Sequence, residues 1–157
     1  MENQLTILAE SLDKKIQVLT AIQEYNKRQE QVFSAEKVDM DGFDAAVEEK
    51  GKLIERLTLL DAGFEIMYEK LSKQLQGNRE RYAEEIRALQ AKITTITEMS
   101  VTIQAQEKRN KQLIEQYFAK ERAGIRQSRK TSKAAYDYYR KMSNVSFEQP
   151  QYYDSKK

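Results

Sequence analysis

Apolar residues recur along the first 34 residues at the spacing of one helix face. The positions that stand three, four or seven apart are Leu5, Leu8, Leu12, Leu19 and Ile22. This spacing places them on one side of an α-helix. Polar residues interrupt the face at Lys15, Asn26 and Gln29, and further apolar side chains broaden it. A broad apolar face is typical of a bundle helix rather than of a two-stranded coiled coil, so we expect a bundle helix over residues 3–34.

The most regular pattern lies between residues 40 and 76, where apolar positions alternate steps of four and three. These positions are Phe43, Val47, Ile54, Leu57, Phe64, Tyr68, Leu71 and Leu75. Lys50 and Asp61 occupy two places in the same pattern. The pattern predicts a packed helix over residues 40–76. Asp39 or Asp41 can serve as its N-cap, because a carboxylate accepts a hydrogen bond from a free amide at a helix start.

The apolar pattern changes phase at Gly77 and Asn78. A new series follows at Tyr82, Ile86, Leu89, Ile93, Ile96, Ser100 and Ile103. Either Gly77 or Asn78 adopts the left-handed conformation that ends a helix and the chain reverses, or one continuous helix carries a stutter. We favour the reversal, because an uninterrupted helix from residue 40 to 103 would have little to pack its far half against.

A third helix is predicted over residues 79–140, with Glu107 and Asn110 at two of its apolar positions. It exceeds the other two in length, so the part beyond about residue 110 is expected to project from the bundle. The expected fold is all-α: an antiparallel bundle of three long helices with an extended C-terminal helix. We expect residues 1–142 to form one helical domain and residues 143–157, which contain Pro150 and two terminal lysines, to be a disordered, flexible tail.

The composition excludes several kinds of chemistry. The 157 residues include no Cys and no His, so disulfides, zinc sites of the usual kind and catalytic triads cannot form. The aspartates 39, 41 and 44 are spaced like the start of a calcium loop, but the acidic residue that such a loop needs at its twelfth position is missing. We therefore expect a protein that is not an enzyme and has no cofactor and no metal.

The chain also lacks the signals for export and membrane insertion. Its first residues have no basic region followed by an apolar core. Its apolar runs are too short to span a bilayer, and a third of its residues are charged. We expect a cytoplasmic protein without membrane insertion.

Apolar and aromatic residues continue after the regular pattern of the third helix has ended. Such residues are enriched where proteins bind one another, and they receive amphipathic helices. The alternative is that the third helix bends back and buries them in its own bundle. The candidate partner-binding residues are Leu113, Ile114, Tyr117, Phe118, Arg122, Ile125, Arg126, Arg129, Tyr136, Tyr139 and Met142.

The same region is basic, with 11 basic and 4 acidic residues over positions 107–141. This favours either an acidic partner or a solvated helix face. Nucleic acid is not expected as a partner, because the whole chain carries a net charge of only +2 and contains no known nucleic-acid-binding motif.

Several phrases of the sequence resemble the FlgN-type flagellar export chaperones, in their clostridial-like form. The resemblance covers most of the chain beyond the first helix. The phrases are DGFDAAVEEK (41–50), LIERLTLLDAGFE (53–65), IQAQEKRNKQLI (103–114), SKAAYDYYRKM (132–142) and the terminal YYDSKK.

This resemblance implies a cytoplasmic helical chaperone that binds hook–filament junction proteins before their export. Such a chaperone holds the C-terminal helical segment of its client, prevents premature assembly and delivers the client to the flagellar type III export apparatus. In the family the C-terminal helix region binds the client, which corresponds here to residues 113–142. Two other functions stay open: an export chaperone for another flagellar client such as the filament cap protein, and a structural coiled-coil adaptor that is a homo-oligomer through Leu8 and Leu12.

Overall fold

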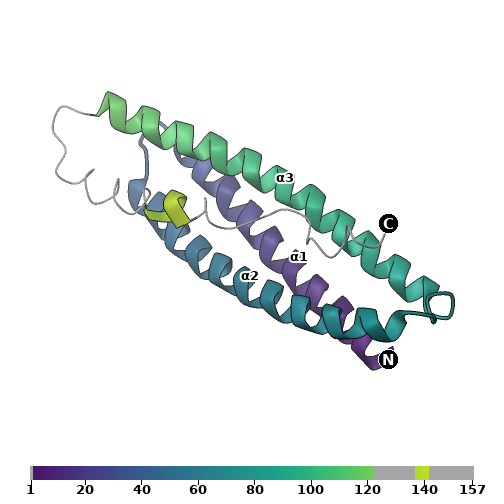
Figure 1. Cartoon of the computed structure of the whole chain (residues 1–157). Coiled ribbons are helices and arrows are strands. Elements are labelled where there is room, and N and C mark those ends of the chain that lie inside the picture. The colour runs from purple at the N-terminus through teal and green to yellow at the C-terminus, as the bar shows by residue number, and fades with distance from the viewer. Residues whose placement is uncertain (1, 122–136, 142–157) are drawn as a thin grey trace.

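Three long helices make up most of the protein (Figure 1). The computed structural model describes residues 2–121 and 137–141. The helices are α1 (Glu2–Val32), α2 (Met40–Leu75) and α3 (Ala83–Lys120), and residues 137–141 form a further short helical segment. No strand occurs in these two described ranges. The predictions of an all-helical fold and of three long helices are confirmed.

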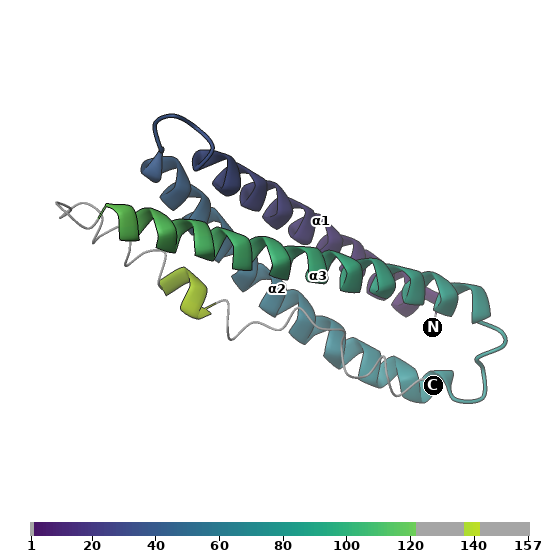
Figure 2. The same cartoon turned by 90° about the horizontal axis from the view of Figure 1, so that it is seen from above.

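The helix α1 is the central element, because α2 and α3 both pack along it and make little backbone contact with each other. Side-chain pairs define the directions. Lys15 of α1 pairs with Asp61 of α2 and Asn26 of α1 pairs with Lys50, so numbers rise along α1 as they fall along α2. On α3, Lys92 pairs with Asp13 and Arg109 with Glu30. Thus α2 runs opposite to α1, and α3 runs in the same direction as α1 (Figure 2).

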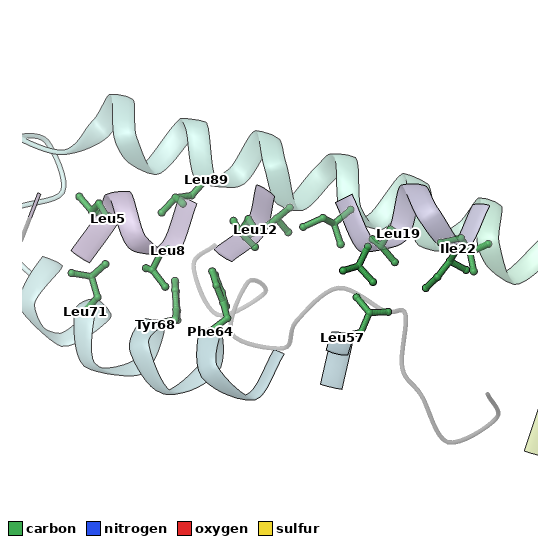
Figure 3. Packing of buried hydrophobic residues seen from close by; sticks show 14 of the residues in the cluster. Leu5, Leu8, Leu12, Leu19, Ile22, Leu57, Phe64, Tyr68, Leu71 and Leu89 are labelled. Carbon is green, nitrogen blue, oxygen red and sulfur yellow. The ribbon is translucent and has the colours of Figure 1, made fainter. Parts of the chain in front are cut away.

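The main core is built on the apolar face that the sequence of α1 predicts. Figure 3 shows leucines of α1 between Phe64, Tyr68 and Leu71 of α2 and Leu89 of α3. The face is fully used within the chain, since Leu8 is 0% exposed and Leu12 is 3% exposed. The described residues include no helix with an apolar stretch long enough to cross a bilayer.

Asp39 is the N-cap of α2. Its Oδ1 accepts a hydrogen bond of 2.9 Å from the amide nitrogen of Gly42. The glycine allows this close approach, because a Cβ at position 42 would lie 2.5 Å from Oδ2 of Asp39. Asp41 lies in the first turn instead, where a negative charge interacts favourably with the helix dipole. The structure thus decides between the two candidate caps.

The chain reverses between α2 and α3 at the position where the apolar pattern changes phase. Gly77 has a φ of 88°, in the left-handed region that glycine adopts without strain. The amide nitrogen of Asn78 donates to the carbonyl oxygen of Leu75 over 2.9 Å. The structure therefore has the reversal and not the stutter. Residues 76–82 form turns, and α3 begins at Ala83 rather than at the predicted residue 79.

The C-terminal part of the chain differs from the predicted extended helix over 79–140. The helix α3 ends at Lys120, where the amide of Glu121 donates to the carbonyl oxygen of Tyr117. A continuous helix would place residue 138 about 46 Å from residue 107. The hydroxyl of Tyr138 instead lies 2.7 Å from Oε1 of Glu107. Residues 137–141 therefore pack against the bundle rather than projecting from it, and the predicted tail 143–157 lies outside the described residues.

The capping assignment predicts unequal effects of two neighbouring aspartates. Asp39→Ala should lower the free energy of unfolding by about 1 kcal/mol, because it removes the hydrogen bond to the helix start. Asp41→Ala should lower it by only about 0.5 kcal/mol, since only the interaction with the helix dipole is lost. Urea unfolding followed by circular dichroism measures both. Equal losses would contradict the assignment of Asp39 as the cap.

Candidate functional site

Lys50 of α2 is a charged residue in the interior of the bundle. Its side chain is fully buried, and its Nζ lies 2.7 Å from Oδ1 of Asn26 on α1. The same Nζ lies 2.9 and 3.1 Å from the two carboxylate oxygens of Glu107 on α3. An ammonium group has three protons to donate. One lysine therefore joins all three helices at one level.

Asn26 connects this ion pair to a wider set of hydrogen bonds. Its Nδ2 donates to Oε1 of Gln106 over 3.2 Å. Its backbone carbonyl oxygen accepts a bond of 3.0 Å from Nδ2 of Asn110. Asn26 and Asn110 are both 1% exposed. Because buried polar groups are costly unless they are bonded, these bonds hold α1 and α3 at one relative position.

Tyr138 completes the cluster. It belongs to the short helical segment 137–141, which Figure 1 shows in yellow-green. Its hydroxyl donates to Oε1 of Glu107 over 2.7 Å, and the Nζ of Lys50 lies 4.1 Å from its ring centroid. A cation in this position is attracted by the electrons of the ring. Tyr138 thus binds both members of the ion pair.

Apolar side chains surround the ring of Tyr138. Phe43 and Val47 of α2 and Ile114 of α3 form one buried cluster with it. We call Phe43, Val47, Lys50, Glu107 and Ile114 the Tyr138 socket. It lies at the end of the bundle where α1 connects to α2 (Figures 1 and 2).

Further aromatic residues extend this end of the bundle. The ring centroids of Phe33 and Phe43 are 5.5 Å apart, and those of Phe33 and Tyr117 are 6.0 Å apart. Tyr117 also contacts Phe118, with 5.8 Å between centroids. Tyr139 lies beside Tyr138 at 5.2 Å. Aromatic pairs in such edge-on and tilted arrangements are individually favourable.

Burial shifts the proton affinity of the central groups. Desolvation lowers the pKa of Lys50 from 10.5 to about 8, and the nearby Glu107 carboxylate opposes this change. Desolvation also raises the pKa of Tyr138 well above its usual 10.0, with further contributions from the charge of Glu107 and the hydrogen bond to it. The pKa of Tyr139 is raised in the same direction, first by burial and then by Glu107 and Glu115. Both hydroxyls therefore keep their protons at ordinary pH, and that of Tyr138 donates to Glu107.

The structure brings together part of the candidate site that the sequence predicts. Ile114 is buried at 2% exposure, in the Tyr138 socket. Leu113, Tyr117, Phe118 and Tyr139 are half-buried around it. The other candidates lie outside the described residues: Arg122, Ile125, Arg126, Arg129, Tyr136 and Met142.

Sequence reasoning did not connect the polar members of the cluster. Lys50, Glu107 and Asn110 each stand at a core position of an apolar pattern, and so does Asn26. Each reads as an interruption when its helix is taken alone. The signal that identifies them is that the interruptions lie at matching levels once the helices are aligned.

The groups of the cluster are engaged in holding the Tyr138 side chain. Among residues 2–121 and 137–141, no group of three or more acidic residues could hold a metal ion. The carboxylate of Glu107 is already engaged by an ammonium and a phenol. The arrangement fixes an aromatic side chain by its ring and by its hydroxyl.

The buried ion pair predicts a non-additive pair of substitutions. Lys50→Met should lower the free energy of unfolding by about 3–5 kcal/mol, because it leaves the buried Glu107 carboxylate and Asn26 with neither a counter-charge nor the hydrogen bonds that Lys50 donates. Combining it with Glu107→Leu should restore part of that loss. The matched control is Lys52→Met, which removes an exposed pair with Glu49 and should change stability by less than about 0.5 kcal/mol. Urea unfolding measures all three, and a Lys50→Met protein as stable as the control would refute the role of the pair.

The lowered pKa of Lys50 predicts a pH dependence of stability. Between about pH 8 and 10.5 the unfolded chain holds the Lys50 proton and the folded chain does not. Unfolding then takes up a proton, so the free energy of unfolding rises with pH in this range. The stabilisation that comes from a neutral Lys50 in the folded chain is complete above pH 10.5 and is lost as the pH falls through 8. Above pH 10 the raised tyrosine pKa values act in the opposite direction.

The free energy of unfolding should therefore rise from pH 8 to 10 by up to about 1.4 kcal/mol per pH unit. The rise should be absent in Lys50→Met. Urea titrations at pH 7, 8, 9 and 10 test this, and identical pH profiles for the two proteins would contradict it.

Comparison with known proteins yields no relative. No protein-family model, no curated protein and no solved structure matches this chain. A functional conclusion therefore depends on the contacts described above and on the resemblance of the sequence phrases.

Proposed function

We propose that this protein is a FlgN-type flagellar export chaperone that acts in the cytoplasm. It binds the C-terminal helical segment of hook–filament junction proteins, prevents their premature assembly and delivers them to the flagellar export apparatus. It catalyses no reaction. The client binds at the aromatic end of the bundle, around the Tyr138 socket.

One observation carries this proposal: the bundle end already holds a short helical segment. Residues 137–141 lie against α2 and α3 through Tyr138, which is 4% exposed. The room exists because α2 and α3 each pack on α1 rather than on each other. A site that accepts a short helix with one inserted aromatic residue can accept a client helix by the same contacts.

The client takes the place of residues 137–141 in this proposal. Release of that segment uncovers Phe43, Val47 and Ile114, which it covers through Tyr138. The half-buried Tyr117 and Phe118 lie at the edge of the same surface. The burial of Ile114 is therefore compatible with its predicted role in client binding.

The docked segment has features of an occupant that can be displaced. The described part of the segment, residues 137–141, is too short to form a stable helix alone. The hydroxyl of Tyr139 is buried without a hydrogen bond to any described residue, which is unfavourable by about 1–3 kcal/mol. Because a client must compete with the segment and lose its own freedom on binding, its affinity is moderate and its release is possible.

The basic residues of the predicted site add a charge preference. Arg122, Arg126 and Arg129 lie outside the described residues, between the end of α3 and the docked segment along the chain. Their charge favours a client whose helix carries acidic groups near its apolar face.

The structural coiled-coil alternative has less support. It needs the apolar face of α1 for association, but Leu8 and Leu12 lie in the core between α2 and α3. To contact a second copy of the chain, Leu8 and Leu12 would have to leave the core, which would open the bundle. The alternative of a chaperone for the filament cap protein differs from this proposal only in the client. Measuring the binding of each client directly distinguishes the two.

Binding of a labelled C-terminal segment of a hook–filament junction protein tests the proposal, with fluorescence anisotropy as the measurement. Tyr117→Asp should weaken binding at least tenfold, because it places a charge on the apolar surface that receives the client. Val101→Asp is the matched control, since Val101 is 63% exposed on α3 outside this surface. It should bind like the unchanged protein.

Tyr138→Ala should strengthen binding several-fold, because the competing segment is then released. Circular dichroism establishes that each variant keeps its helix content. If the labelled client segment binds none of these proteins, the client assignment is wrong. If the labelled client segment binds Tyr117→Asp and the Val101→Asp control equally, the proposed binding site is wrong.

A further inference from the structure

A second surface, on the outer face of α2, is apolar and is left exposed by the described residues. Leu59 is 74% exposed and Ile66 is 58% exposed. They stand seven positions apart, so they lie on one face of the helix, two turns apart. Ala62 and Gly63 lie between them and are exposed too. Apolar side chains that are exposed together on one face mark surfaces where a protein contacts a partner.

Gly63 is not needed by the fold of the single chain. A Cβ added at this position would meet no atom within 4 Å. Glycine in the middle of a helix is less favourable than alanine by about 1 kcal/mol. What glycine offers there is close approach of another backbone.

The charges that flank this surface are arranged symmetrically about its centre. Two helices that cross antiparallel at the midpoint between Ala62 and Gly63 bring together residues equally distant from that midpoint. All members of the resulting pairs are exposed. The pairs are Leu59 with Ile66, Glu55 with Lys70, and Arg56 with Glu69.

We propose that this protein forms a symmetric homodimer through the α2 face defined by Glu55, Arg56, Leu59, Ala62, Gly63, Ile66, Glu69 and Lys70. The two α2 helices cross antiparallel at Ala62 and Gly63, and Leu59 of each copy packs on Ile66 of the other. A two-fold axis repeats each contact. The interface therefore contains two Leu59–Ile66 contacts, two Glu55–Lys70 ion pairs and two Arg56–Glu69 ion pairs, arranged symmetrically about the crossing.

The order of the charges along this face favours a second copy of the chain as the partner. It also requires the two α2 helices to run antiparallel. A parallel pair in register would place Glu55 against Glu55 and Lys70 against Lys70, which is unfavourable. The antiparallel pair converts both repulsions into attractions. One like-charged pair remains, Lys52 with Lys73. It lies about 16 Å from the crossing, where two crossing helices diverge, and Lys52 has an ion pair of its own with Glu49.

The size of the surface sets the strength of the dimer. A contact made by one helix face is smaller than a standard protein–protein interface of about 1,600 Å². The dimer is therefore weak and depends on protein concentration. The surface spans residues 55–70, whereas the α2 part of the Tyr138 socket spans residues 43–50, so dimer formation and client binding involve different parts of α2.

Sedimentation velocity of the full chain over a concentration series tests the dimer. The unchanged protein should move from monomer to dimer as the concentration rises. Ile66→Asp should stay monomeric at every concentration, whereas the exposed control Val101→Asp should dimerise normally. A protein that is monomeric throughout, or an Ile66→Asp variant that dimerises normally, would overturn the proposal.

Charge reversal tests the antiparallel order. Glu55→Lys and Lys70→Glu should each weaken dimerisation at least fivefold, because each makes two like-charged contacts. An equal mixture of the two variants should dimerise, since every Lys then faces a Glu across the axis, and so should the double variant. If neither combination restores the dimer, the proposed pairing is wrong.

Substitution at the crossing tests the role of Gly63. Gly63→Gln puts a long side chain at the closest approach and should weaken the dimer at least fivefold. Gly51→Gln is the matched control, because an added Cβ at position 51 also meets nothing within 4 Å. Both changes favour the helix in the monomer. Equal dimerisation of the two variants would place the interface elsewhere.

Discussion

The ion pair between Lys50 and Glu107 is the constraint on which the rest of the structure depends. Both side chains are buried, and a buried charge without a partner is strongly destabilising. A slip of α2 by one turn would move Lys50 about 5.4 Å from Asn26 and from Glu107. Leucine and isoleucine contacts elsewhere in the core tolerate such a slip much better, because they have no direction. The charged pair therefore fixes the axial position of α2 and α3 on α1.

The same pair gives the bundle end its chemical character. The carboxylate and the ammonium attract a phenol from two sides, through its hydroxyl and through its ring. The apolar walls then select an aromatic side chain over an ordinary polar one. A requirement of the core thus also holds one aromatic side chain, Tyr138, at the place where we propose that the client binds.

Some elements follow directly from local sequence. The periodicity of residues 40–76 predicts α2 to within one residue of its observed end, because a long regular apolar face has only one way to be buried. Gly77 marks the reversal, since few residues other than glycine adopt a φ of 88° without strain. Asp39 as the N-cap was one of two local possibilities. The hydrogen bond to Gly42 depends on geometry that spacing alone cannot decide.

The candidate site was only partly predictable. Ile114, Tyr117 and Phe118 were identified as apolar and aromatic residues beyond the end of the regular pattern, but the sequence could not show that Tyr138 returns to cover Ile114. The partners Asn26, Lys50, Glu107 and Tyr138 are separated by at least 24 positions along the chain. Periodicity acts over a few helical turns and carries no information at that separation.

The sequence by itself determined that the chain forms three long helices and which of their faces are apolar, and it favoured a reversal at Gly77 or Asn78. These properties arise from interactions between near neighbours. Only the tertiary structure decided that α1 is central, that three polar interruptions meet as one ion-pair cluster, and that residues 137–141 pack against it. Those outcomes depend on the alignment of whole helices. That alignment is set by the need of each buried charge for a partner on another helix.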